Sequence, residues 1–309
     1  MDRPGAPSRA QWLRRLGSRR RDRVAIVLSG GGPLGALQVG ALKAIFEKAI
    51  VPDIVVGTSV GSLNAAYLAF DPTPEGVLAM ERHWRNFTEN DLFPGGRYRA
   101  AWARMFVRGN KMFENTGLRR VIERELGADT QIEDAEVPLA IVATDLETGA
   151  ERVLTSGPLT PALLASAAMP GVYPPVDIDG RLYTDGGVSN NVPIAPAVNL
   201  GATTLYVLNS TSHTNQRRPL VRPMDYFFHG FTLARAQRLT IDMRLYAEKV
   251  NLVMIPTPPL DFFVPFASME HTAKLIDLAY EHTRRFLAGD LPLAEGGVQP
   301  SLEVGTPGK

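Results

Sequence analysis

Short apolar runs that end in glycine-rich turns, each followed by a helical pattern, constrain the fold of this sequence most. Val24–Leu28 (VAIVL) is a continuous apolar run of the kind found in buried parallel strands, and SGGGPLG follows it. Apolar side chains then recur at helical spacing over 36–49. A second short strand, 54–56, ends at GTSVG, and an apolar helix is expected over 63–70. The alternation predicts an α/β fold with a mostly parallel central sheet and helices on both faces.

Helical and strand patterns also alternate over the rest of the chain. Helices are expected over 75–87, 118–126 (with Thr116 as the N-cap), 161–168, 193–200 and 268–288. Strands are expected over 139–144, 151–155, 181–184, 203–209 and 250–255. We therefore expect one folded domain at 23–288, in which 71–135 forms a helical cap or insert, and flexible tails at 1–22 and 289–309.

Composition and charge exclude several classes of protein. The 309 residues contain no cysteine, which rules out disulfide scaffolds, thiolate metal sites and cysteine nucleophiles. The net charge is +1 and gives no general reason to expect nucleic acid as a partner. Residues 1–23, however, carry eight arginines against two aspartates. We interpret this segment as a solvated tail. The alternative interpretation is an arm that is attracted to an anionic membrane surface.

The turn Gly57-Thr58-Ser59-Val60-Gly61 is the strongest local signal for chemistry. A serine between a strand and a helix, with glycine two residues to either side, matches the G-x-S-x-G turn that exposes a nucleophilic oxygen. The helix N-terminus beside it favours negative charge. The simpler alternative is a glycine-rich turn whose serine only caps the helix.

The loop Gly30-Gly31-Gly32-Pro33-Leu34-Gly35 offers backbone N–H groups to an anion. Its glycine spacing also satisfies the dinucleotide motif G-x-G-x-x-G, which requires an acidic residue after the second strand. Asp53 lies before that strand, so the dinucleotide is disfavoured. The favoured anion is the oxygen of a tetrahedral intermediate formed at Ser59.

Asp185-Gly186-Gly187 follows a strand directly and supplies a candidate base. Asp-Gly is also common in ordinary turns. Its position at a strand end gives it weight, because open α/β sheets gather their sites there. Four histidines follow Ser59 and Asp185 in the order that a Ser-Asp-His triad needs, yet none lies in a glycine-bounded loop after a strand. We therefore interpret the histidines as structural or surface residues: His83, His213, His229, His271 and His282.

Taken together, these motifs resemble the patatin-like phospholipase family, of the bacterial type with a single patatin domain. The resemblance covers roughly 24–288 and includes the stretches ATDLETG and ASAAMPGVYPPV. It implies Ser59 as nucleophile and Asp185 as its partner in a Ser-Asp dyad. It also implies an oxyanion hole at Gly30, Gly31, Gly32 and Gly35. Gly57, Gly61, Gly186 and Gly187 would support the two turns.

The implied activity is that of a serine acyl-lipid hydrolase, a carboxylic ester hydrolase of the phospholipase A, lysophospholipase or esterase type that acts in lipid catabolism. No cofactor and no metal are expected. The chain departs from the family pattern at Leu34, where a basic residue is usual, and this removes a positive charge beside the oxyanion loop. The alternative is a weakly active or non-catalytic lipid-binding protein on the same fold, and a remote one is a dinucleotide-binding protein.

The weak basicity of aspartate leads to an expectation about the substrate. The ordinary pKa of aspartate lies about 2.6 units below that of histidine, which costs roughly 3.5 kcal/mol of driving force for proton transfer. A dry site recovers part of this, because desolvation raises the pKa of a carboxyl. A long acyl chain in an apolar channel would supply that dryness. We therefore expect an acyl lipid substrate, no specific nucleic acid partner, and a cytoplasmic protein with peripheral membrane contact through 1–23.

Overall fold

The computed structural model of the chain describes residues 22–92, 113–211, 223–265 and 268–291. Its centre is an eight-stranded mixed sheet with the order β5-β6-β3-β2-β1-β7-β8, and β4 pairs with β3 off this path. The strands are β1 (Val24–Leu28), β2 (Ile54–Thr58), β3 (Leu139–Asp145), β4 (Glu151–Leu154), β5 (Val176–Ile178), β6 (Arg181–Asp185), β7 (Thr204–Leu208) and β8 (Asn251–Ile255). The five strands β3, β2, β1, β7 and β8 are parallel, as the alternating pattern predicts.

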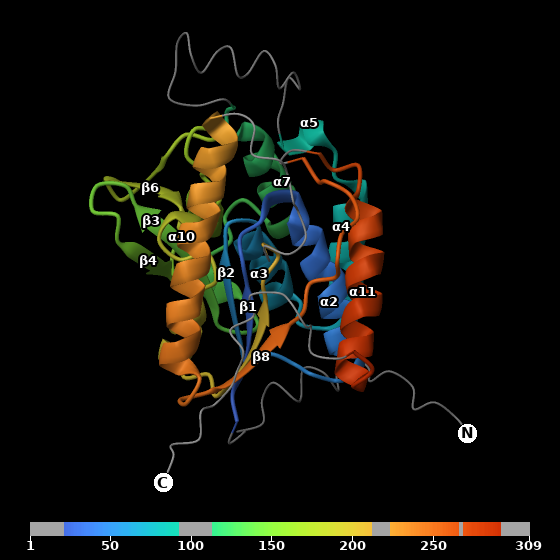
Figure 1. The fold of residues 1–309 in the computed structure, drawn as a ribbon. Coiled ribbons are helices and arrows are strands. Elements are labelled where there is room, and N and C mark those ends of the chain that lie inside the picture. The colour runs from blue at the N-terminus through green and yellow to red at the C-terminus, as the bar shows by residue number, and fades with distance from the viewer. Residues whose placement is uncertain (1–21, 93–112, 212–222, 266–267, 292–309) are drawn as a thin grey trace.

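Helices cover both faces of this sheet (Figure 1). One face carries α2 (Gly35–Glu47), α3 (Val60–Phe70), α4 (Pro74–Asn86), α7 (Thr116–Leu126), α8 (Leu159–Ser166) and α11 (Thr272–Ala288). The other face carries α9 (Ile194–Asn199) and α10 (Pro223–Tyr246). The short elements are η1 (Gly32–Leu34), α5 (Glu89–Leu92), η2 (Ile132–Asp134) and η3 (Gly186–Val188).

The alternating side chains of the strands explain this three-layer arrangement. Ile26, Leu28 and Val55 belong to the core under α2, α3 and α11, whereas Ala25 and Val27 face the core under α9 and α10. All five side chains are fully buried. A strand that buries both of its faces reads as a continuous apolar run, and this is why VAIVL has no polar alternation.

Strand β3 places the ends of β2 and β6 next to one another. Thr58, the last residue of β2, pairs with Val142, and Asp185, the last residue of β6, pairs with Ala143. The opposite edge of β3 is occupied by β4 at the same residues. Strand β6 therefore takes over the edge of β3 at the point where β2 leaves it, and the residue after Thr58 faces the end of β6.

Several boundaries differ from the expectations. The helix at 116–126 begins at Thr116 itself, and Asn115, not Thr116, occupies the N-cap position. Pro193 is likewise the residue before α9 and not its first residue. Strand β5 and the long helix α10 were not predicted. Most of the two expected tails lies outside the described residues.

None of the helices in the described segments combines the length and the apolar character needed to cross a bilayer.

Candidate functional site

Ser59 lies on the tight turn between β2 and α3, in a backbone conformation that side chains rarely adopt (φ 55°, ψ −128°). The turn is closed by Gly57 and Gly61. A Cβ on Gly57 would collide with the carbonyl oxygen of Gly61, and one on Gly61 with that of Leu28. The glycines are thus required by close backbone approach, and the strand–turn–helix context predicted for this motif is present.

Hydrogen bonds fix this turn on both sides of Ser59. The N–H of Ser59 donates to Ser166 Oγ at 2.9 Å, and Ser166 Oγ itself donates to the carbonyl of Val142 at 2.6 Å. The carbonyl of Ser59 accepts from Ser62, through its N–H at 2.8 Å and its Oγ at 2.6 Å. These bonds satisfy the backbone of the turn while the Ser59 hydroxyl stays free to reach across to β6.

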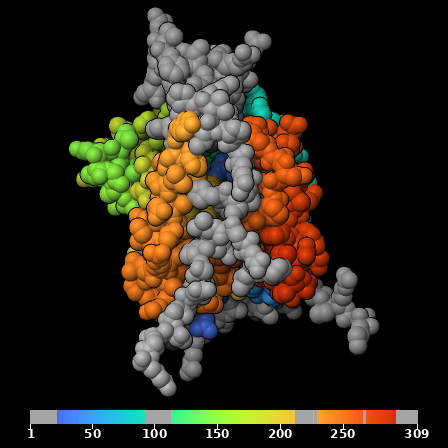
Figure 2. Space-filling view, viewed as in Figure 1, coloured from blue at the N-terminus to red at the C-terminus, as the bar shows by residue number. Residues whose placement is uncertain are grey.

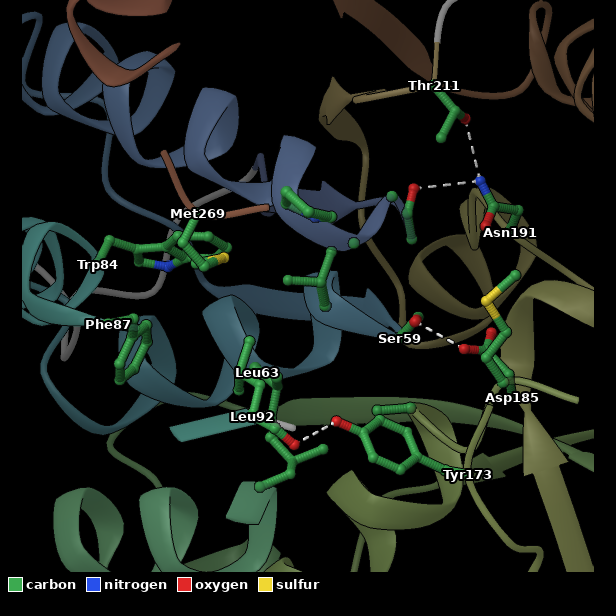
Figure 3. A pocket seen from close by; sticks show the side chains of 18 of the residues that line it. Ser59, Leu63, Trp84, Phe87, Leu92, Tyr173, Asp185, Asn191, Thr211 and Met269 are labelled. Carbon is green, nitrogen blue, oxygen red and sulfur yellow. Dashed lines mark hydrogen bonds between the residues drawn. The ribbon is translucent and has the colours of Figure 1, made fainter. Parts of the chain in front are cut away.

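Asp185 meets that hydroxyl. Ser59 Oγ donates to Asp185 Oδ2 at 2.7 Å, and the two side chains point toward one another in Figure 3. The other carboxyl oxygen, Oδ1, accepts from the N–H of Gly187 at 2.7 Å. A Cβ on Gly186 would collide with the carbonyl of Val142, so the turn after β6 packs directly on β3. Two residues predicted from separate motifs, 126 positions apart in the chain, are hydrogen-bonded partners.

The electrostatics of Asp185 follow from its burial. The residue is 2% exposed, and this burial raises the pKa of its carboxyl. The positive charge of Arg235 and the hydrogen bonds from Ser59 and Gly187 lower the pKa and oppose that effect. A carboxyl with a raised pKa is a stronger proton acceptor than a solvated aspartate.

The glycine loop lies over the same site, but its four glycines are not equivalent. Gly30, Gly31 and Gly32 line the cavity at Ser59. The N–H of Gly30 donates to the carbonyl of Asn191, and that of Gly35 donates back into the loop. For Gly31 and Gly32 no acceptor of the N–H occurs among the described residues. Within that part of the chain, these two N–H groups are therefore not used in internal hydrogen bonds.

A cavity of about 240 Å³ leads away from Ser59 and Asp185. Its wall is largely apolar, and several of its side chains converge in Figure 3. The apolar lining comprises Pro33, Val60, Leu63, Trp84, Phe87, Leu92, Leu118, Ala167, Met169, Tyr173 and Met269. Helices α4, α5 and α7 of the expected cap thus contribute to this wall. Because 93–112 lie outside the described residues, a cap over the site stays a prediction.

Three polar residues of the cavity were not anticipated from the sequence: Asn191, Thr211 and Arg235. Arg235 reaches the cavity from α10, and Asn191 reaches it from the loop after η3. Asn191 is 3% exposed, and its Oδ1 has no hydrogen-bond donor in the described part of the chain. The run FTLARAQRLTIDMRLY, rich in strong helix formers, would have revealed α10. Nothing in the sequence alone points Arg235 toward Asp185.

Among the described residues, the histidines that a Ser-His-Asp triad requires and the aspartate that a dinucleotide site requires lie away from the cavity at Ser59. No histidine of the described segments lines the cavity, and His83 Nδ1 contacts Glu125 at 2.8 Å. Asp53 accepts a hydrogen bond from the N–H of Val24, at the end of β1 opposite to the glycine loop. It cannot serve a nucleotide bound at that loop. Leu34, which stands where the family pattern in the sequence analysis has a basic residue, is half-buried against the core.

Comparisons with known proteins agree with the motifs. The chain is 33% identical over 188 residues to patatin-like phospholipase domain-containing protein 6 of Homo sapiens, and the match covers 60% of this chain and 13% of that protein. It is 31% identical over 185 residues to the neuropathy target esterase sws of Drosophila melanogaster, covering 58% of this chain and 12% of that protein. The chain therefore matches only a small part of these much longer relatives.

Among solved structures, VipD from Legionella pneumophila aligns over 88% of this chain and 67% of its own, with a TM-score of 0.46 and 12% identity. A model of the patatin-like phospholipase family matches residues 26–198, a range that includes the glycine loop, Ser59 and Asp185. Since that match covers more than half of the chain, the chain belongs to the patatin-like phospholipase family.

Proposed function

We propose that this protein is a serine acyl-lipid hydrolase that cleaves carboxylic esters with a Ser59–Asp185 dyad. The observation that carries the proposal is the 2.7 Å hydrogen bond from Ser59 Oγ to a buried carboxyl oxygen of Asp185, in the lining of a largely apolar cavity. Membership of the patatin-like phospholipase family supports the same reaction class.

The geometry suggests the following sequence of steps. Ser59 Oγ attacks the acyl carbonyl carbon, and its proton passes to Asp185 Oδ2. The negative oxygen that forms accepts hydrogen bonds from the N–H groups of Gly31 and Gly32. Collapse of the intermediate breaks the ester bond, and Asp185 returns the proton to the leaving alcohol. Water, activated by Asp185, then releases the fatty acid from Ser59.

The apolar wall supports a long acyl chain as the group that binds in the cavity. Filling the cavity removes water from around Asp185, and this further raises the pKa of a carboxyl that must accept a proton. Each methylene that becomes buried contributes up to about 0.8 kcal/mol to binding. We therefore expect kcat/KM to rise along a series of esters from acetyl to dodecanoyl.

The direct test is hydrolysis of this ester series by purified protein and two variants. Ser59→Ala and Asp185→Asn should each lose at least about 10³-fold in kcat, since a nucleophile and its base act as one unit. The controls are Ser156→Ala and Asp129→Asn, both exposed and outside the cavity, which should keep wild-type activity. Hydrolysis that persists in Ser59→Ala would contradict the proposal. Binding of lipid without any hydrolysis would instead favour the non-catalytic alternative.

The cavity itself can be tested through Leu63, which lines it from α3. Leu63→Trp places a larger side chain in the path of the acyl group. We expect it to reduce kcat/KM for dodecanoyl esters by at least tenfold and to leave acetyl esters within about threefold, because only a long chain needs that space. A uniform loss along the series would mean that the acyl group does not occupy this cavity.

A further inference from the structure

Arg235 brings a positive charge to the Ser59–Asp185 site from a helix that lies outside the family match. Helix α10 packs on the face of the sheet opposite to α2 and α3, and it forms a long exposed ridge in the space-filling view (Figure 2). Residue 235 lies on this helix, well beyond 198, the last residue matched by the family model. Its side chain nevertheless lines the same cavity as Ser59 and Asp185.

The guanidinium is held in place against the turn that also holds the aspartate. Arg235 Nε donates to the carbonyl of Gly187 at 2.8 Å, while the N–H of Gly187 donates to Asp185 Oδ1 at 2.7 Å. The guanidinium carbon lies 4.0 Å from the ring centroid of Phe231, one turn earlier on α10. A Cβ on Gly187 would collide with the guanidinium. One glycine residue thus connects Arg235 to Asp185, and a side chain there would displace the guanidinium from this position.

The other charged groups around this turn are already paired. Arg238 contacts Asp242 at 2.9 Å and Glu151 at 3.5 Å, and Arg181 contacts Asp145 at 3.2 Å. Within the described segments, neither Asp185 nor Arg235 forms an ion pair. The two charges therefore interact electrostatically without direct contact. Burial lowers the pKa of Arg235 and the charge of Asp185 raises it, which is the counterpart of the effect on Asp185.

We propose that Arg235 is a positioning residue that keeps the Asp185 carboxylate ionised and oriented to accept the proton of Ser59. The inference rests on the proposed function and adds to it a residue that no motif supplies. A buried carboxylate without a nearby cation would hold its proton over a wider pH range and could not act as a base there. The fixed guanidinium stabilises the ionised form without touching Ser59 itself.

The test is the pH dependence of kcat/KM for a neutral chromogenic ester, measured for wild type, Arg235→Gln and Arg235→Lys. Loss of the charge should move the acid limb of the profile upward by about one pH unit in Arg235→Gln. On that limb the variant should therefore lose about tenfold more activity than on the alkaline plateau. Arg235→Lys keeps the charge, so its acid limb should stay close to that of wild type.

A matched control is Arg244→Gln, which removes the same charge from an exposed position on the same helix. Its acid limb should not move. An unmoved limb in Arg235→Gln, with hydrolysis still dependent on Ser59, would overturn the role of Arg235 and leave the proposed function standing. Absence of Ser59-dependent hydrolysis in the wild type would overturn both.

A second readout does not depend on activity. The unfolding free energy of wild type and Arg235→Gln is measured over a pH series, with and without Asp185→Asn. Because loss of the charge raises the pKa of Asp185 in the folded protein further, Arg235→Gln should lose stability relative to wild type as pH rises through that titration. In the Asp185→Asn background the gap should be independent of pH. Parallel curves in both backgrounds would contradict the coupling.

Discussion

At the scale of the residue, the backbone of Ser59 carries a cost in free energy that the proposed function explains. Its φ of 55° with ψ −128° is a combination that glycine adopts freely and other residues do not. Such strain amounts to about 1–3 kcal/mol and is retained where a side chain must be presented in one direction. Ser59 is half-buried and lines the cavity, and the proposed reaction needs its hydroxyl there.

Because of this strain, we expect glycine to be more stabilising than alanine at position 59, the reverse of the usual order. Both Ser59→Gly and Ser59→Ala remove the hydroxyl, so they differ mainly in backbone freedom. Glycine usually destabilises a fold relative to alanine by about 0.5–1 kcal/mol. Here we expect Ser59→Gly to be the more stable of the two by about 1 kcal/mol, measured by urea unfolding. A more stable alanine variant would show that the turn is unstrained.

The buried carboxyl of Asp185 leads to a prediction about stability and pH. Since its pKa is raised in the folded protein, the folded state binds more protons than the unfolded state above the ordinary aspartate range. The contribution of this group to stability therefore falls as pH rises, until the folded carboxyl has ionised. Asp185→Asn removes this effect, so its stability relative to wild type should increase over the same pH window. A difference that stays constant with pH would refute the raised pKa.

The two central residues could be predicted because each sits in a motif with its own local geometry. Ser59 is marked by glycines that its turn needs, and Asp185 by the strand that ends at it. Arg235 and Asn191 have no such mark, since their proximity to the site depends on how α10 and the loop after η3 pack in three dimensions. The oxyanion hole expected at Gly30, Gly31, Gly32 and Gly35 stays a prediction, and the sequence could not show that the N–H groups of Gly30 and Gly35 bond within the protein.

At the scale of the element, the packing of α11 on α2 depends on a glycine inside a helix. A Cβ on Gly40 would collide with the backbone carbonyl of Ile276 on α11. Helix propensity alone would favour Gly40→Ala by about 1 kcal/mol. Because backbone cannot move aside as a side chain can, we expect the substitution to destabilise the protein by about 2 kcal/mol or more.

A matched control for this substitution exists on α10. Gly230 is exposed, and no atom lies near the position of its missing Cβ. Gly230→Ala should therefore stabilise the protein by up to about 1 kcal/mol, the opposite sign to Gly40→Ala. Thermal unfolding of the two variants measures both effects. Equal shifts of the same sign would contradict the close contact between α2 and α11.

The helices and strands themselves were predictable where an apolar run is bounded by glycine, proline or polar turn residues. Strands β1, β2, β3, β6, β7 and β8 and helices α2, α3 and α11 follow from periodicity, within a few residues at their ends. Helix α10 was missed because its apolar residues do not fall on one face: Leu233, Ile241 and Leu245 are exposed, whereas Met243 is buried. Strand β5 has three residues and is defined only by its pairing with β6.

At the scale of the whole molecule, the family match ends before the sheet does. Residues 26–198 contain the dyad but not β7, β8, α10 or α11. Strand β7 pairs with β1 along all five of its residues, and α11 covers α2. A fragment that ends at 200 would expose the edge of β1 and the buried face of α2. We expect it to lack cooperative unfolding in circular dichroism, whereas the chain from 22 to 291 should retain it.

Activation of the Ser59 hydroxyl by Asp185 can be measured by reaction with a fluorophosphonate, followed by mass spectrometric mapping of the adduct. We expect a single adduct on Ser59, none in Ser59→Ala, and at least about 10²-fold slower labelling in Asp185→Asn. An adduct on any other residue, or labelling of Ser59 at an unchanged rate in Asp185→Asn, would contradict this activation.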